Sequence, residues 1–289
     1  METILRPVYQ ERSGHPDTLG IILMEDGTDV ILTSLGFEAV LLIVVNKAEQ
    51  PVFVEHYHNG EKNAVLFTVT RDKIREWMNN EKNEPILHWL NKGKVLFERN
   101  DFMNRLKEEM NGFPASLRKE KLAQEFSKVI YKFFEGKTLF DKEKYLDAFK
   151  FVVESLNHLG RMAIIEKGWH SEPAEWQQVR KAAPEISKLY EELITSNESL
   201  DKRLQLFFLA GGFYIHAKTE SGVQYFLEVL REKEQWTINE MYSHEKLNSY
   251  FPEFCNVLEY LIEKNFVKII SEEAEENNTL HRYYRVHQA

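Results

Sequence analysis

The sequence predicts an α+β protein in three parts: an α/β domain over residues 1–113, an all-α domain over 114–220 and a winged helix-turn-helix domain over 221–289. Runs of Ile, Leu and Val in the first third indicate buried strands. Long stretches with apolar residues at helical spacing follow, and the last part has three helical segments before two β-rich ones. A chain of 289 residues accommodates two or three such domains, at roughly 100–200 residues each.

The first domain opens with a short helix over residues 4–10, followed by strands over 19–24 and 40–45. Asn59 and Gly60 separate two further β-rich runs, a pattern typical of a β-hairpin because both residues tolerate positive φ. Thr70 is a suitable N-cap for the next helix. The closing elements of the domain are a strand and a helix, over residues 95–99 and 102–110.

The middle domain begins after Gly112 and Pro114, which together stop a helix and prevent its continuation. Gly136 and Gly168 are expected to end the first two helices of this domain. The five expected helices cover residues 117–135, 141–167, 173–182, 184–195 and 200–217.

The last part predicts a winged helix whose second helix is capped by Thr237, with Glu240 completing a capping box. The other expected elements are two helices and two strands, over residues 222–232, 252–264, 266–270 and 281–286. From Ser221 onward there are 12 Glu and 7 Lys or Arg residues, a net charge of −5. DNA binding needs clustered positive charge, so a protein partner or a homodimer formed through this domain is favoured over DNA.

The composition favours a protein of the cytoplasm. The single cysteine, Cys255, cannot form an internal disulfide, and its apolar helical surroundings predict a packed thiol. The N-terminus does not resemble a signal peptide, and no apolar run approaches the ~18–20 residues that cross a bilayer, so no membrane association is expected. The net charge of −9 disfavours general nucleic-acid binding.

The order of these segments resembles the nucleotidyltransferase-like proteins of Bacillus and relatives, distant kin of the kanamycin nucleotidyltransferase group in the polymerase-β superfamily. The resemblance covers nearly the whole chain. It rests on GFEAVLLIVV, on a hairpin with HNGE, and on the helical segment YLDAFKFVVESLNHLGRMAIIEKG. It implies a helical substrate-binding-like domain and a C-terminal winged helix.

The resemblance also implies a magnesium ion and a nucleoside triphosphate, but the residues for them are incomplete. Active members hold the triphosphate on a Gly-Ser turn, where this chain offers Gly27 after two acids, Glu25 and Asp26. They bind Mg²⁺ through two carboxylates on the next strand and a third from the hairpin. In this chain Glu38 matches the first strand carboxylate, but Val40 stands at the position of the second. Ala64, Val65 and Leu66 stand where the third carboxylate would lie.

Three residues of the middle domain are further candidates. Glu135 lies near the position of a general base in active relatives, or it simply ends a helix. His158 and Arg161 share a helix face and could contact a nucleotide in the cleft between the first two domains. The alternative is a buried, hydrogen-bonded histidine beside a surface arginine.

Three functions remain open. The leading one is a non-catalytic or weakly active protein that binds a nucleotide or a small polar ligand. The second is an active Mg²⁺-dependent transferase that acts on a small molecule or a protein, with Glu38 and a loop acid, Asp26 or Asp29, as metal ligands. The third is a regulatory protein that acts through its winged helix.

Overall fold

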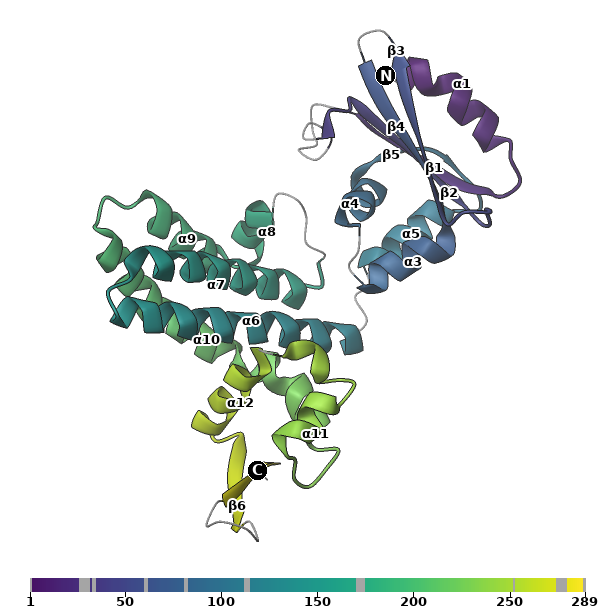
Figure 1. Cartoon of the computed structure of the whole chain (residues 1–289). Coiled ribbons are helices and arrows are strands. Elements are labelled where there is room, and N and C mark those ends of the chain that lie inside the picture. The colour runs from purple at the N-terminus through teal and green to yellow at the C-terminus, as the bar shows by residue number, and fades with distance from the viewer. Residues whose placement is uncertain are drawn as a thin grey trace. The chain divides into compact units, whose positions relative to one another are not determined.

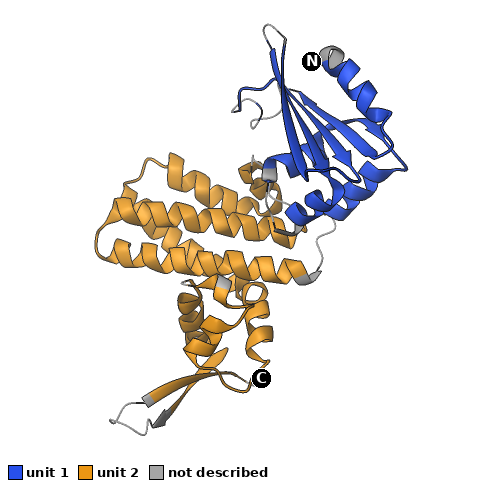
Figure 2. Cartoon of the chain, turned by 45° about the vertical axis from the view of Figure 1, so that its right-hand side comes forward, with its two compact units in different colours: residues 1–113, 170–174 blue, residues 114–169, 175–289 orange. Residues whose placement is uncertain are grey.

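The computed structural model describes residues 2–25, 32, 35–59, 62–80, 83–111, 115–169, 175–251, 253–273 and 280–287. The chain divides into two compact units (Figure 2). Unit 1 comprises residues 1–113 and 170–174, and unit 2 comprises 114–169 and 175–289. None of the described helices is long and apolar enough to cross a membrane.

Unit 1 is built on a five-stranded mixed sheet in the order β3-β4-β2-β1-β5. The strands are β1 (Thr18–Glu25), β2 (Ala39–Val45), β3 (Val52–Asn59), β4 (Lys62–Thr70) and β5 (Lys94–Glu98). β2 lies parallel to β4, whereas β1 runs antiparallel to both β2 and β5. β3 and β4 form the expected hairpin.

Helices cover both faces of this sheet, which explains why β2 is apolar at every position. Leu5 of α1 packs on the face that carries Ala39, Leu41 and Ile43. The opposite face, with Val40 and the alternate residues of β2, is covered by three helices. The helices of unit 1 are α1 (Glu2–Ser13), α3 (Arg71–Asn80), α4 (Glu84–Lys92) and α5 (Phe102–Asn111).

The sequence did not predict α4. Pro85 lies in its first turn, where the missing N–H costs nothing, so this proline begins a helix rather than breaking one. Trp89 and Leu90 of this helix are buried against the sheet.

Unit 2 contains a helical bundle in which α6, α7 and α10 lie side by side (Figure 1). The bundle helices are α6 (Ala115–Asp141), α7 (Tyr145–Glu166), α8 (Glu175–Ala182), α9 (Pro184–Thr195) and α10 (Leu200–Leu230). Gly168 has a φ of 74° and follows the end of α7 as predicted.

Two predicted helix breaks are wrong, and close packing is the reason. α6 continues through Gly136, where an added Cβ would lie 3.2 Å from Cβ of Phe151 on α7. α10 continues through Gly222, so the helix predicted over residues 222–232 is its last part. There an added Cβ would lie 2.4 Å from Cγ of Phe126 on α6. Both glycines allow helices to approach each other rather than ending them.

The C-terminal region has the predicted order of helices and strands. Thr237 caps α11 (Ile238–Ser243), and Glu240 completes the capping box. The remaining elements are η1 (Asn248–Tyr250), α12 (Glu253–Glu263), β6 (Val267–Glu273) and β7 (Leu280–Val286). The prediction that Cys255 is packed is wrong: its thiol is exposed, because the apolar face of α12 instead presents Phe254 and Val257.

Candidate functional site

The first candidate site lies where β2 begins. Glu38 is half-buried directly before this strand, and its carboxylate Oε2 accepts a hydrogen bond of 2.5 Å from the backbone N–H of Asn63. The backbone N–H of Glu38 in turn donates to the carbonyl of Asn63 over 2.9 Å. The side chain of Asn63 lies 2.8 Å from Nδ1 of His58. Glu38 therefore joins the start of β2 to the hairpin.

The neighbouring positions hold apolar side chains. Val40 pairs with Val65 in the parallel β2–β4 register, so both side chains point to the same face. Val40 is 0% exposed and Val65 is 2% exposed, and both belong to the core under the helices. This pair presents two packed isopropyl groups beside Glu38.

The described residues at this end of the sheet do not fit a magnesium ion. Mg²⁺ requires oxygen ligands in octahedral geometry, and Glu38 supplies one carboxylate that already accepts a backbone hydrogen bond. No group of three or more His, Cys, Asp or Glu side chains that could hold a metal occurs among the described residues. Asp26, Gly27 and Asp29, the other candidates here, lie outside the described residues.

The second candidate site is a row of charged side chains along α6 and α7. Nδ1 of His158 lies 2.7 Å from Oε2 of Glu125, and Nζ of Lys128 lies 2.9 Å from Oε1 of the same carboxylate. Glu125 is 8% exposed, so both carboxylate oxygens are bonded in a largely dehydrated setting. The bond fixes the ring of His158, because Nδ1–H must donate to the carboxylate.

The environment of Glu125 favours its charged form. Burial by itself raises the pKa of this carboxyl, but the hydrogen bonds and charges of His158 and Lys128 outweigh burial and lower the pKa to about 2. Glu125 is therefore an anion at neutral pH. Among the described residues, no hydrogen-bond partner of Nε2 of His158 is found, so this nitrogen is available to a ligand.

Two more ion pairs extend the row in opposite directions. Nζ of Lys132 lies 2.7 Å from Oε2 of Glu154. Nε of Arg161 donates to Oε1 of Glu175 on α8 over 2.8 Å. His158 and Arg161 thus lie one turn apart on α7, as predicted, but each contacts a different carboxylate.

Sequence reasoning identified His158 but missed Glu125 and the lysines on the same face of α6. The signal was present: Glu125, Lys128 and Lys132 recur at spacings of three and four and so share one face of α6. Such a stripe is usually read as a solvated face, and the carboxylate became visible only through its contact with α7. Glu135, the proposed general base, is half-buried within α6 rather than at its end.

Comparison with known proteins matches the three parts of the chain in order. Residues 1–119 match the family described as nucleotidyltransferase-like, 119–218 the YgxA-like substrate binding domain, and 224–286 a helix-turn-helix domain. The uncharacterized protein YgxA of Bacillus subtilis (strain 168) is 40% identical over 98% of this chain and 97% of its own length. The crystal structure of a nucleotidyltransferase-like protein from Exiguobacterium sibiricum 255-15 is similar with a TM-score of 0.68, at 29% identity over 99% of both chains.

Proposed function

Because this chain belongs to the nucleotidyltransferase-like family that includes YgxA of Bacillus subtilis, we propose that it is a non-catalytic or weakly active member that binds a small polar ligand. The ligand is a nucleotide or a molecule of similar polarity. Its contacts come from the helical domain, which matches a substrate binding domain. Such a protein is a pseudoenzyme.

The observation that carries the proposal is the buried pair Val40 and Val65. The family resemblance assigns metal-binding carboxylates to these two neighbouring stretches of strand. Two packed valines cannot coordinate a hard cation, and among the described residues at this end of the sheet Glu38 is left without a second carboxylate for Mg²⁺. A triphosphate bound without its metal would lack the charge neutralisation that nucleotide transfer requires.

His158 is the residue that we assign to ligand binding. Its ring is oriented by Glu125, so Nε2 is presented in a fixed direction and loses little freedom when a ligand binds. Arg161, one turn further along α7, supplies a guanidinium that Glu175 holds in place. Together they suit a polar ligand with a hydrogen-bonding group and an anionic group.

The test is calorimetric titration of ATP, GTP, CTP and UTP into the full chain, with and without Mg²⁺. Binding that does not depend on the metal and weakens about tenfold in His158→Gln supports the proposal. His216→Gln is the matched control, since His216 is an exposed histidine of unit 2 on α10. Nucleotide transfer at an enzymatic rate that Glu38→Gln abolishes would instead support an active transferase that uses Glu38 with Asp26 or Asp29.

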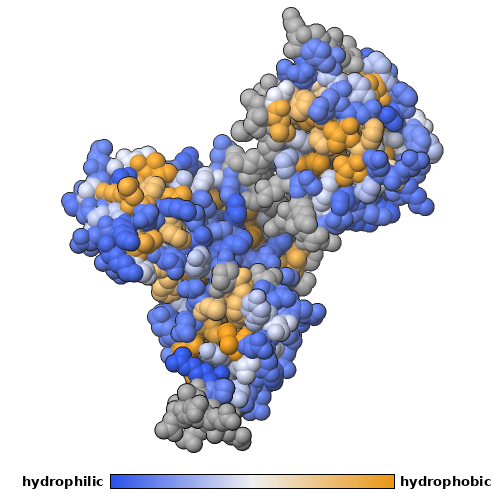
Figure 3. Space-filling model, viewed as in Figure 1, coloured by the Kyte–Doolittle hydropathy of each residue, from blue (hydrophilic) through white to orange (hydrophobic). Residues whose placement is uncertain are grey.

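A second candidate function, a regulator that docks a protein partner, is favoured by the surface of the winged helix. Ile238 and Tyr242, one turn apart on α11, are 41% and 59% exposed. Figure 3 shows hydrophobic side chains among hydrophilic ones on the visible surface of unit 2. A DNA-binding surface would instead need lysine and arginine at these two positions, to contact the phosphates.

The partner hypothesis, which includes a homodimer formed through this domain, is tested by light scattering and by affinity capture with the full chain. Tyr242→Ser should release a captured protein or dissociate a dimer. A chain that is monomeric, captures no protein and shifts DNA instead would contradict this second candidate.

A further inference from the structure

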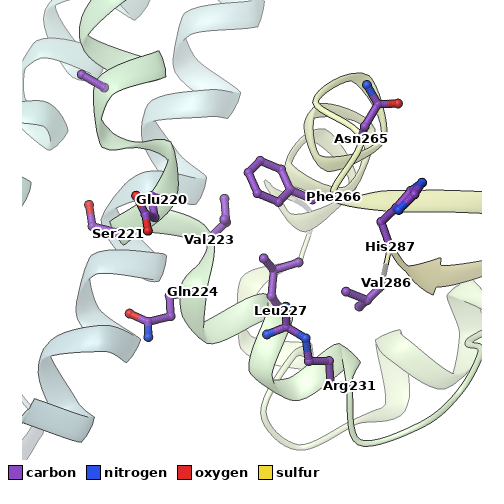
Figure 4. Close-up of a pocket in the computed structure, with 11 residues that line it drawn as sticks. Glu220, Ser221, Val223, Gln224, Leu227, Arg231, Asn265, Phe266, Val286 and His287 are labelled. Carbon is purple, nitrogen blue, oxygen red and sulfur yellow. The ribbon is translucent and has the colours of Figure 1, made fainter. Parts of the chain in front are cut away.

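A pocket of about 700 Å³ lies in unit 2 between α10 and the hairpin of the winged helix. Figure 4 shows residues of α10 on one side and Phe266, Val286 and His287 across from them. Ligand pockets in proteins measure about 300–1,000 Å³, so this volume suits a small organic molecule. The pocket is separate from the charged row on α6 and α7 described above.

Arg231 supplies positive charge to the pocket, and its guanidinium has no partner among the residues that the structure describes. Figure 4 shows its side chain reaching along α10 toward Leu227. Within the ranges that the structure describes, Arg231 makes no side-chain hydrogen bond or ion pair. Three glutamates lie within three residues of it, and each pairs with another cation. These pairs are Glu228–Lys119 at 2.7 Å, Glu232–Lys246 at 2.6 Å and Glu234–Arg285 at 2.8 Å.

Because these three carboxylates pair elsewhere, no described acidic side chain neutralises Arg231. A guanidinium binds a carboxylate in a planar, bidentate geometry, which makes it a suitable anchor for an organic acid. Leu227, Phe266 and Val286 supply apolar surface next to it.

The far end of the pocket has the opposite character. Glu220 and Gln224 line it from α10, and Glu220 is eleven residues from Arg231, or about 16 Å along the helix axis. A second anionic group would be repelled by Glu220, whereas a hydrogen-bond donor would be accepted by Glu220 or Gln224. The lining therefore has a cationic end, an apolar middle and an acceptor end.

We propose that this pocket binds a small organic monoanion, a carboxylic acid with an apolar body, with its carboxylate on Arg231. This function goes beyond the ligand binding that we assign to His158. One wall is α10, which is a bundle helix, and the other wall is the base of the β6–β7 hairpin. A bound acid contacts both and thus holds the hairpin against the bundle.

The experiment uses 3-phenylpropionate as the probe and its uncharged amide, 3-phenylpropanamide, as the chemical control. Binding to the full chain is measured by ligand-detected NMR, and amide hydrogen exchange is followed in β6 and β7. Arg231→Gln removes the charge of the anchor. Lys202→Gln is the matched control, because Lys202 is an exposed cation of the same helix outside the pocket.

The expected result is saturable binding of the acid, slower exchange in the hairpin, and at least about tenfold weaker binding in Arg231→Gln and for the amide. Lys202→Gln should bind as the unmodified chain does. Failure of the full chain to bind 3-phenylpropionate would overturn the proposal. So would equal binding by a folded Arg231→Gln variant, or equal binding of acid and amide.

Discussion

At Gly222, α10 approaches α6 closely, and replacing this glycine with alanine tests how tightly the two helices pack. The new Cβ would lie 2.4 Å from Cγ, 2.5 Å from Cδ2 and 2.8 Å from Cβ of Phe126. Phe126 is 0% exposed and also packs edge-on against Tyr260 of α12 at 5.8 Å, so its ring has little room to move.

Overpacking a core costs about 1–3 kcal/mol, and alanine regains about 0.5–1 kcal/mol over glycine within a helix, so the net loss for Gly222→Ala is up to about 2.5 kcal/mol. Gly212→Ala in the same helix is the control, because its nearest new contact, Cζ of Phe133, would lie 3.7 Å away. That variant should gain up to about 0.5–1 kcal/mol.

Urea unfolding followed by circular dichroism at 222 nm, which reports the helices, measures both variants. The midpoint should fall for Gly222→Ala and rise or stay unchanged for Gly212→Ala. If Gly222→Ala proves as stable as Gly212→Ala, the close approach of α10 to α6 is refuted.

The pKa of Glu125 is lowered from an ordinary value of 4.5 to about 2, so its charged form stabilises the fold above pH 4.5 and that stability is lost as the pH falls toward 2. Glu125→Gln should remove roughly 2–3 kcal/mol at neutral pH and flatten the acid limb of a stability–pH curve, and an unchanged limb would contradict the assignment. Thr237→Ala should cost about 1 kcal/mol through loss of the α11 cap, seen as a lower urea midpoint, whereas exposed Thr195→Ala should cost little. Glu38→Gln keeps an oxygen acceptor for the N–H of Asn63, so its thermal midpoint should stay within about 1–2 °C of the unmodified chain, and a large fall would indicate an ionic role.

The sequence predicted the strands and most of the helices because their signals are local. The apolar run at residues 39–45, the turn at Asn59 and the capping pair Thr237 and Glu240 each specify structure within a few residues. The wrong helix ends at Gly136 and before Gly222 have a different origin. Glycine in a sequence is compatible both with the end of a helix and with the close approach of a second helix. Only the residue that packs against it distinguishes the two roles.

The candidate site was predictable only in part, for the same physical reason. The valines at the positions where the resemblance implies carboxylates were visible in the sequence, since Val40 follows Glu38 by two residues and Val65 lies in the predicted hairpin. Glu125 was not, since its burial and its bond to His158 depend on how α6 meets α7, 33 residues along the chain. The pocket beside Arg231 likewise requires the hairpin and α10 to come together.

Metal-independent ligand binding is tested most simply by a thermal-shift panel of ATP, GTP, CTP and UTP. Each nucleotide is measured with and without Mg²⁺ or Mn²⁺, on the unmodified chain and on Glu38→Gln. A ligand at 100 times its dissociation constant stabilises a protein by about 2.7 kcal/mol, which such a panel detects. We expect the same shift for a nucleotide with and without metal, and the same shift in Glu38→Gln. A shift that requires the metal and disappears in Glu38→Gln would contradict this expectation, because the metal site would then be intact.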